Sequence, residues 1–402
     1  MKILVLNCGS SSVKYKLFDT HGESADVLAE GGVEKIGLPG GFLKYKKTDG
    51  SKETVELGHI DHRQAIEAIL ANLTDSEVGC IASYDEIDAV GHRVVHGGEK
   101  FSASVLIDDA VKEKIRECYD IAPLHNPANM VGIEAIEAIM PGVPQVGVFD
   151  TAFHQTMPAK AFMYAIPYSY YTEDGVRRYG FHGTSHRYVS ERVCRFLGVD
   201  PKDTKVITCH IGNGASMAAV ENGKCVDTSM GLTPTEGLMM GTRVGDIDPG
   251  ALTYLMTKHN LTADGLQAII NKESGVLGVS GVSNDMREIE AAIAAGNERA
   301  RLALDMYMLR ITKYIGAYAA EMGGVDVIAF TGGVGENQTG LRADVCSTLG
   351  FMGVEIDTAL NAGIRGVEAT VSTPGSKVKV CVIPTDEELT IARDTEDIVA
   401  AL

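Results

Sequence analysis

Apolar and polar positions alternate along the first twenty residues in a pattern that predicts a β-hairpin. An apolar run at residues 2–6 enters a short polar turn, and a segment follows in which apolar side chains alternate with lysines: Val13, Lys14, Tyr15, Lys16, Leu17. A period of two residues is typical of a strand with one buried face. The second strand should end at His21-Gly22, because glycine readily adopts the backbone conformation of a tight turn.

The same pattern recurs halfway along the chain. Residues 2–12 (KILVLNCGSSS) and residues 205–215 (KVITCHIGNGA) share a lysine, an apolar strand, a polar residue and a glycine in the same order. The second copy also leads to a Gly-containing turn, at Asn222-Gly223. The two halves therefore follow one plan, and each polar glycine turn can bring backbone N–H groups close to phosphate oxygens.

Strand and helix patterns alternate through the rest of the sequence, which predicts α/β architecture. One helix should begin at Asn126-Pro127 and stop at Pro141-Gly142, and the longest should span about 298–322. A third should begin after Thr184-Ser185, end at Gly198 and bury four side chains: Val189, Val193, Phe196 and Leu197.

A third strand-then-glycine turn is predicted where residues 325–330 enter the segment Gly332–Asn337. Neither a Walker phosphate loop nor a complete dinucleotide fingerprint is present. One glycine turn alone is equally consistent with a purely structural role. Three such turns, at 7–12, 210–214 and 332–337, favour a nucleotide site because each removes side-chain bulk where a ligand could approach.

Length and charge narrow the class of protein. A chain of 402 residues exceeds one comfortable core and predicts two domains of similar size. Its 36 basic and 54 acidic residues give a net charge of −18, which argues against a nucleic-acid partner and against an anionic membrane surface. The eight cysteines are scattered without a CxxC pair, and no signal-peptide pattern or long apolar run is evident, so we expect a cytoplasmic protein.

Three cations lie within two residues of a glycine: Arg93, His182 and Arg243. For any one of them a surface ion pair is an adequate explanation. The pairs His92/His96 and His182/His186 also invite a zinc interpretation, although the glutamate of an HExxH motif is missing. In so acidic a chain, three cations on glycine-flanked segments that we expect to be loops indicate an anionic substrate, because arginine binds carboxylates and phosphates at two points.

Carboxylates complete the candidate chemistry. Asp150 ends an apolar strand, and the carboxyl ends of strands are where α/β sheets hold ligands. Glu387 and Glu388 follow a strand at 378–383 and are equally consistent with acids at a helix N-terminus. One or two carboxylates are enough to hold a magnesium ion that also binds phosphate oxygens.

Several of these motifs together resemble the acetate kinase (acetokinase) family, and the resemblance runs from end to end. They are NCGSSS at 7–12, GFHGTSH at 180–186, HIGNG at 210–214, MGTRVGD at 240–246, DMR at 285–287 and GVGEN at 333–337. The resemblance implies a duplicated ribonuclease-H-like (actin-like ATPase) fold, as in sugar kinases and heat-shock ATPases, with two lobes around a nucleotide cleft. It places the first lobe at 1–152 plus 388–402 and the second, with the nucleotide site and a dimer interface, at 153–387.

The resemblance also implies a role for each matching residue. Arg93 holds the acetate carboxylate, and the methyl group contacts four apolar residues: Val95, Leu124, Phe181 and Pro234. His182 and Arg243 stabilise the phosphoryl group in transfer, and Asp150 orients the reacting groups. Asn7 and Glu387 support Mg²⁺, for which Mn²⁺ substitutes. ATP or ADP contacts the remaining set: Lys14, His210, Ile211, Gly212, Asn213, Gly214, Asp285, Met286, Arg287, Gly333, Val334, Gly335, Glu336 and Asn337.

The expected reaction is reversible, direct in-line transfer of the γ-phosphoryl group of ATP to acetate, giving acetyl phosphate and ADP, by a homodimer. A propionate kinase is an alternative, since one methylene changes binding by only about 1–3 kcal/mol. A sugar or polyol kinase would share the fold but needs a base for a neutral hydroxyl group. An actin-like or chaperone ATPase would not need His182 and Arg243 at a third ligand.

Overall fold

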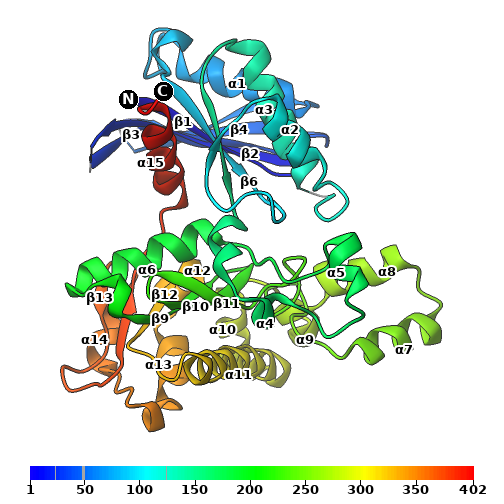
Figure 1. The fold of residues 1–402 in the computed structure, drawn as a ribbon, viewed down its shortest axis with the longest axis vertical. Helices are drawn as coiled ribbons and strands as arrows, with labels where there is room; N and C mark the ends of the chain where they lie inside the picture. The colour runs from blue at the N-terminus through cyan, green and yellow to red at the C-terminus, as the bar shows by residue number, and fades with distance from the viewer. Residues whose placement is uncertain (23, 48–49, 124) are drawn as a thin grey trace. The chain divides into compact units, whose positions relative to one another are not determined.

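The structure is a computed structural model that describes residues 1–22, 24–47, 50–123 and 125–402. Its strands and helices alternate as the sequence predicts, so the α/β class is confirmed. Contacts within the chain define two units (Figure 1). The first comprises Met1–Gln155 and Asp386–Leu402, and the second comprises Thr156–Thr385.

The predicted hairpin opens the first unit. β1 (Lys2–Cys8) pairs antiparallel with β2 (Ser12–His21), and the turn is closed by a 2.8 Å hydrogen bond from the Gly9 amide to the Ser12 carbonyl. Alternate side chains of β2 face inward as expected: Val13, Tyr15 and Leu17 are buried, and Lys14 is exposed.

A mixed sheet carries this unit, and within the described residues its strand order is β5-β4-β3-β2-β1-β6-β8-β7. The central pairs β1/β6 and β6/β8 are parallel. The remaining strands are β3 (Ser24–Glu34), β4 (Gly41–Lys46), β5 (Lys52–Gly58), β6 (Ala89–Val94), β7 (Val105–Leu106) and β8 (Gln145–Phe149).

Helices cover both faces of the sheet because successive residues of a strand point to opposite sides. Leu4 and Leu6 face the core under α1 (His62–Leu73) and α3 (Asn126–Ile139), whereas Ile3 and Val5 face α15 (Glu387–Val399). Figure 1 shows α15 and the pair α1 and α3 on either side of the strands. The other helical segments are η1 (Tyr84–Glu86), α2 (Asp109–Arg116) and η2 (Ala152–Thr156).

The second unit repeats the plan, and the predicted duplication is confirmed. Its strand order, β11-β10-β9-β12-β14-β13 among the described residues, matches β3-β2-β1-β6-β8 of the first unit over five strands. In both sheets an antiparallel hairpin precedes parallel strands. The strands are β9 (Lys205–Ile211), β10 (Ala215–Glu221), β11 (Lys224–Thr228), β12 (Val327–Thr331), β13 (Ala369–Thr370) and β14 (Lys379–Val382).

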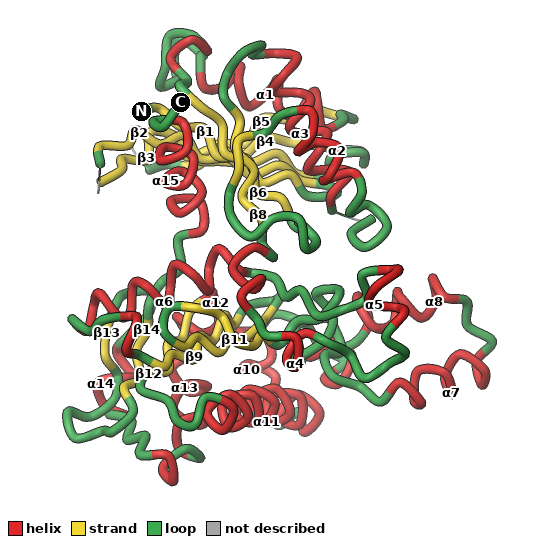
Figure 2. Tube along the Cα trace, viewed as in Figure 1, coloured by secondary structure: helices red, strands yellow, loops and turns green. Residues whose placement is uncertain are grey.

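Two helices pack against opposite faces of this second sheet. Figure 2 shows its strands between α6 (Gly183–Leu197) and α11 (Glu298–Glu321). The other helices are α4 (Ala159–Phe162), α5 (Ser169–Asp174), α7 (Pro249–His259), α8 (Ala263–Ala268), α9 (Gly275–Ser280), α10 (Met286–Ala294), α12 (Gly332–Asn337), α13 (Thr339–Ser347) and α14 (Thr358–Gly363). Shorter helical turns are η3 (Pro201–Asp203), η4 (Ile269–Glu273) and η5 (Gly350–Met352).

Two details of the predicted helices are wrong. Helix α6 begins at Gly183, before the predicted start, because His182 has a left-handed backbone (φ 55°) that sets the helix boundary. Thr184 and Ser185 are therefore buried inside its first turn. Of the four side chains expected in the core, Val189 and Val193 are buried, but Phe196 is exposed and Leu197 is half-buried, since they lie toward the end of the helix.

Two segments that the sequence suggested were loops belong to regular elements. Arg93 lies on strand β6, one residue before its end. The third glycine turn is the short helix α12, which starts directly after β12. Gly332 makes this possible: its φ is 76°, and a Cβ there would lie 2.8 Å from the carbonyl oxygen of Ile211. The close approach lays α12 against β9.

Candidate functional site

Arg93 and Asp150 form a two-point ion pair at the ends of two parallel strands in the first unit. The Arg93 Nε and Nη2 groups donate to the two carboxylate oxygens at 2.9 and 2.7 Å. Burial lowers the pKa of Arg93, but the charge and hydrogen bonds of Asp150 outweigh that effect and raise it above its usual value. The arginine is thus a permanent cation, and Nη1 is the group that the pair does not use.

Two asparagines of α3 hold the chain next to this pair. The Asn129 side chain accepts from the Val95 amide at 3.0 Å and donates to the Cys8 carbonyl at 2.6 Å. The Asn126 side chain accepts from the His96 amide at 3.1 Å and donates back to the His96 carbonyl at 2.9 Å. Sequence reasoning treated Asn126 only as the start of a helix. Asn126 and Asn129 belong to none of the recognised motifs, so the sequence gave no signal for this positioning role.

Acidic side chains gather beside Arg93. Glu387 and Glu388 lie in the first turn of α15, so the helix N-terminus interpretation describes their position correctly. Burial raises the pKa of Glu387 to about 7, with Asp150, Glu388 and Asp386 adding to the rise and Arg93 opposing it. A bound cation would reduce the repulsion between these partly buried carboxylates. The carboxylate oxygens are therefore suitable ligands for a metal cation.

In the second unit, three of the predicted elements converge on one turn. A Cβ placed on Gly214 would lie 3.5 Å from Arg243 Nη1 and 3.8 Å from His182 Nε2. The His182 ring also stacks on His210, with centroids 4.2 Å apart. These residues come from the start of α6, from β9 and its turn, and from the 240–246 loop. They bring an imidazole ring and a guanidinium group to a glycine turn rich in backbone N–H groups.

Arg243 is held by the segment that carries Pro234. Its Nη1 group donates to the Pro234 carbonyl at 3.1 Å, and burial lowers its pKa. That segment is fixed in turn by Glu236, which pairs with Arg178 at 2.7 Å and accepts from the Tyr164 hydroxyl at 2.5 Å. The Arg178–Glu236 pair escaped sequence reasoning because its partners lie far apart in the chain.

Most of the predicted nucleotide residues line one pocket of about 490 Å³ in the second unit. Its wall also includes Asn284, whose side-chain amide donates to the side-chain oxygen of Asn213 at 2.8 Å. The lining residues are Gly212, Asn213, Gly241, Asn284, Asp285, Met286, Arg287, Gly333, Val334, Asn337 and Gln338. Arg287 is exposed and pairs with Asp285 at 2.6 Å, which lowers the pKa of Asp285 to about 2 through that hydrogen bond.

The other predicted nucleotide residues of this unit support the pocket from within. Ile211 is buried in β9, and Gly335 packs on it at 3.5 Å from its hypothetical Cβ. The Glu336 carboxylate accepts from the Gly332 amide at 2.9 Å and from the Thr385 amide at 3.2 Å. This side chain therefore fixes the end of β12 and the chain after β14.

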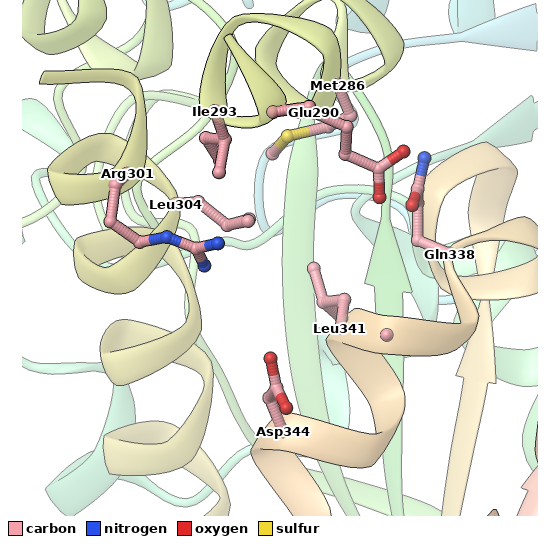
Figure 3. A pocket seen from close by; sticks show the side chains of 10 residues that line it. Met286, Glu290, Ile293, Arg301, Leu304, Gln338, Leu341 and Asp344 are labelled. Atoms are coloured by element: carbon pink, nitrogen blue, oxygen red, sulfur yellow. The ribbon is translucent and has the colours of Figure 1, made fainter. Parts of the chain in front are cut away.

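A second pocket, of about 440 Å³, continues from the first and shares Met286 and Gln338 with it. Figure 3 shows its side chains, which come from α10, α11 and α13, together with Gln338 directly before α13. It combines apolar walls with charged groups: Met286, Glu290, Ile293, Ala294, Arg301, Leu304, Gln338, Gly340, Leu341 and Asp344. Sequence reasoning missed this pocket because its members share no motif.

The remaining predicted residues are distributed between the units. Asn7, Lys14 and Val95 belong to the first unit, on β1, on β2 and after β6, and Phe181 and Pro234 belong to the second. Phe181 and Val95 are buried. Leu124 lies outside the described residues.

The histidine pairs considered for zinc have other partners. His92 Nε2 lies 2.7 Å from the Gln145 side-chain oxygen, and burial lowers the pKa of His92 to about 4. His96 Nδ1 accepts from the Gly98 amide at 3.0 Å. Over the part of the chain that the structure describes, three or more His, Cys, Asp or Glu side chains are nowhere grouped as metal ligands. None of the described helices combines the length and apolar character needed to cross a membrane.

Comparison with known proteins gives a consistent result. The sequence profile of the Acetokinase family matches residues 2–393. The acetate kinase of Phocaeicola vulgatus is 64% identical over 395 residues, which cover 98% of each chain. A crystal structure of Porphyromonas gingivalis acetate kinase matches with a TM-score of 0.96 and 61% identity over 99% of both chains. A propionate kinase from Francisella tularensis matches with a TM-score of 0.91 and 40% identity over 99% of both chains.

Proposed function

The chain belongs to the acetokinase family and functions as an acetate kinase, and we propose that it moves the γ-phosphoryl group of ATP directly onto acetate, in a reversible in-line reaction. One observation carries the residue assignment: His182 and Arg243 meet at the Gly214 turn, beside the pocket lined by the nucleotide motifs. Phosphoryl transfer needs positive groups around the transferred phosphorus, because charge spreads over its oxygens in the transition state.

Acetate requires no general base. Carboxylic acids of this kind are ionised at neutral pH, so the nucleophile carries its negative charge before it binds. Arg93 has a matching permanent charge, and we assign it the acetate carboxylate. Asp150 then acts by orientation, since its two oxygens are committed to Arg93. This arrangement also argues against a sugar kinase, which must remove a proton from a hydroxyl group.

We propose that His182 and Arg243 stabilise the phosphoryl group during its transfer. Arg243 Nη1 is anchored by the Pro234 carbonyl and the Met240 sulfur, and the other N–H groups of the planar guanidinium can reach phosphoryl oxygens. His182 offers its Nε2 edge on the Gly214 side. Each side chain is held by a partly buried hydrogen bond, His182 Nδ1 by Ser216 Oγ at 2.8 Å and Arg243 Nη1 by the Pro234 carbonyl at 3.1 Å.

ATP fits the two connected pockets of the second unit. We place its phosphates at the glycine turns of residues 210–214 and 332–334. The base then enters the second pocket, where Ile293, Leu304 and Leu341 offer apolar contact (Figure 3). The volumes of these pockets lie within the range of about 300–1,000 Å³ that is usual for small-molecule and cofactor sites.

Magnesium fits the oxygen ligands that Asn7 and Glu387 provide. Burial raises the pKa of Glu387, the carboxylates of Asp150, Glu388 and Asp386 add to the rise, and a bound cation would oppose it. A bound Mg²⁺, or Mn²⁺ in its place, would neutralise phosphate charge and hold the γ-phosphate in line. Asn7 and Glu387 supply the protein part of this site, and ATP supplies the rest.

For the acyl group, we propose acetate over propionate. The family resemblance assigns the methyl group to Val95, Leu124, Phe181 and Pro234, and a valine at position 95 is more typical of an acetate than of a propionate preference. The high identity to acetate kinases supports the choice, while the propionate kinase of Francisella tularensis is more distant at 40% identity.

A homodimer is the proposed assembly. The long helix α11 exposes an apolar stripe at Leu302, Met306 and Leu309, spaced by four and three residues. Such a stripe lies on one helix face, and a second copy of the chain would bury it. We also propose a cytoplasmic location, where ATP is available and the eight thiols stay reduced.

The direct test is an assay of acyl hydroxamate formation from ATP and acetate, propionate or butyrate. We expect acetate to give the highest kcat/KM, and ADP release to depend on the carboxylic acid. Hydrolysis of ATP that is independent of acetate would point instead to a binding-coupled ATPase. Equal rates with glucose or glycerol would contradict the role of Arg93.

A further inference from the structure

A line of buried hydrogen bonds runs behind His182. Ser216 Oγ lies 2.8 Å from His182 Nδ1 and 2.8 Å from His186 Nε2. His186 Nδ1 lies 2.6 Å from Thr208 Oγ1. Thr208, His186 and Ser216 are fully buried on β9, α6 and β10, and we call these three residues the relay.

Ser216 couples the two rings that it joins. A hydroxyl group carries one hydrogen, so Ser216 donates to one ring nitrogen and accepts an N–H from the other. Two arrangements satisfy this condition. Either every hydrogen points from Thr208 toward His182, or every hydrogen points the opposite way. The direction of these hydrogen bonds therefore sets the tautomer of His182. In a neutral histidine, the hydrogen bond that one ring nitrogen makes decides which of the two nitrogens carries the hydrogen.

Thr208 decides the direction. Two acceptors compete for its hydroxyl hydrogen: His186 Nδ1 at 2.6 Å and the Ala218 carbonyl at 3.5 Å. Hydroxyl hydrogen bonds are strong at about 2.5–3.0 Å and weak near 3.5 Å, so the hydrogen goes to His186. His186 then carries its own hydrogen on Nε2 and donates to Ser216. Ser216 in turn donates to His182 Nδ1.

This direction leaves the hydrogen of neutral His182 on Nε2. That atom faces the Gly214 turn, where a Cβ added to the glycine would lie 3.8 Å from it. We propose that Thr208, His186 and Ser216 are positioning residues that hold His182 as a neutral donor toward the transferred phosphoryl group. The opposite direction would aim a lone pair at phosphoryl oxygens. A neutral ring also avoids repulsion from Arg243 across the same turn. The inference rests on the proposed function, because it concerns the same transfer.

Nuclear magnetic resonance of the full chain labelled with ¹⁵N-histidine tests the inference without substrate. The chain has 11 histidines, and the signal lost in His182→Gln identifies the ring of interest. At pH 8 we expect the hydrogen of His182 on Nε2, and that of His186 also on Nε2. A hydrogen on His182 Nδ1 would overturn the inference.

A matched pair of variants tests the role of Thr208. Thr208→Val keeps the shape but removes the hydroxyl, whereas Thr208→Ser keeps the hydroxyl. We expect Thr208→Val to mix the tautomers of His182 and to lower kcat by up to about tenfold, the equivalent of one hydrogen bond, with the KM for acetate within about twofold. Thr208→Ser should keep the wild-type tautomer. If His182 in Thr208→Val still carried its hydrogen only on Nε2, Thr208 would not set the tautomer and the inference would be wrong.

The two readouts separate this inference from the proposed function. If the wild-type chain lacks acetate-dependent phosphorylation but shows the expected tautomer, the function fails and the relay stands. If it phosphorylates acetate with the hydrogen on His182 Nδ1, the relay fails and the function stands. Ser216→Ala gives a second break in the same line, should Thr208→Val not fold.

Discussion

Both carboxylate oxygens of Asp150 accept hydrogen bonds from Arg93, and only 1% of the Asp150 side chain is exposed. The Asp150 amide is bound to the Val94 carbonyl at 3.0 Å, so the two strand ends are joined next to the pair. A carboxylate buried this deeply depends on its cation, and the pair therefore serves stability as well as the orientation of Arg93 toward acetate.

Removal of the Arg93 charge should destabilise the protein. We expect Arg93→Met to lower the free energy of unfolding by about 3 kcal/mol, because Asp150 is left buried without a partner. The double variant Arg93→Met/Asp150→Asn should regain part of that loss. Urea unfolding followed by circular dichroism measures both. Arg63→Met is the control, since its exposed pair with Glu67 should contribute under about 1 kcal/mol. Equal effects at the two positions would show that the buried pair is not stabilising.

Loss of Arg243 should remove activity rather than structure. Arg243→Ala is expected to reduce turnover by about 10³-fold or more, as with other arginines that stabilise a transferred phosphoryl group. The secondary structure should be unchanged, because Arg243 contacts the rest of the fold through the Pro234 carbonyl at 3.1 Å and the Met240 sulfur at 3.9 Å, and neither contact lies within a helix or strand. Steady-state assays with acetate and ATP measure the effect, with Arg63→Ala as the matched arginine control. Turnover within tenfold of the wild type would refute the role of Arg243.

The second pocket should determine affinity for the nucleotide base. Leu304→Ser removes an apolar wall of that pocket, and we expect the KM for ATP to rise about tenfold while the KM for acetate stays constant. Initial rates over a range of ATP concentrations measure this change. Leu360→Ser, on α14, replaces an exposed leucine outside the pocket and should leave both KM values unaltered. A rise in the KM for acetate alone would contradict the placement of the base.

Asp227 should make stability depend on pH. Burial raises its pKa from 3.8 to about 7, with Glu321 adding to the rise and Arg178 opposing it. The folded chain therefore keeps a proton that the unfolded chain releases, and stability falls as the pH rises from about 4 to 7. Asp227→Asn mimics the protonated form and should flatten that fall.

Calorimetric Tm values between pH 4.5 and 8 test this expectation. The difference in Tm between Asp227→Asn and the wild type should shift in favour of the variant as the pH increases. Asp203→Asn alters an exposed carboxylate of η3, and its profile should run parallel to that of the wild type. Parallel profiles for both variants would mean that Asp227 titrates normally.

The stripe on α11 should hold the dimer together. Met306→Glu places a charge in the middle of the proposed interface, and we expect it to convert a dimer of the 42.8 kDa chain into monomers. Light scattering coupled to size-exclusion chromatography measures the mass. Leu360→Glu adds the same charge at an exposed leucine of α14 and should remain dimeric. A dimeric Met306→Glu variant would place the interface elsewhere.

Local patterns were enough to predict the hairpins, the long helix and the duplication. The alternation at residues 13–17 follows from a strand with one face in the core, and the chain around His21-Gly22 and Asn222-Gly223 turns where the backbone has positive φ. These features depend on residues that are neighbours in the chain. The family motifs likewise identified the acetokinase family, because each is a continuous run of residues.

Contacts between segments that are distant in the chain could not be predicted from the sequence. The position of Arg93 on a strand, the helical form of residues 332–337 and the exposure of Phe196 depend on what packs against each segment. The hydrogen bonds of the two α3 asparagines, and those from Thr208 through His186 to Ser216, join residues far apart in the chain, so no local pattern predicts them.

By itself, the sequence determined the α/β class, the repeated plan and the family, since those follow from periodicity and from contiguous motifs. The tertiary structure alone decided which buried polar groups pair: Asp150 with Arg93, Glu336 with two backbone amides, Ser216 with two histidine rings. The reason is physical. A hydrogen bond is fixed by distances of a few tenths of an ångström between atoms that folding brings together, and the order of residues along the chain does not encode those distances directly.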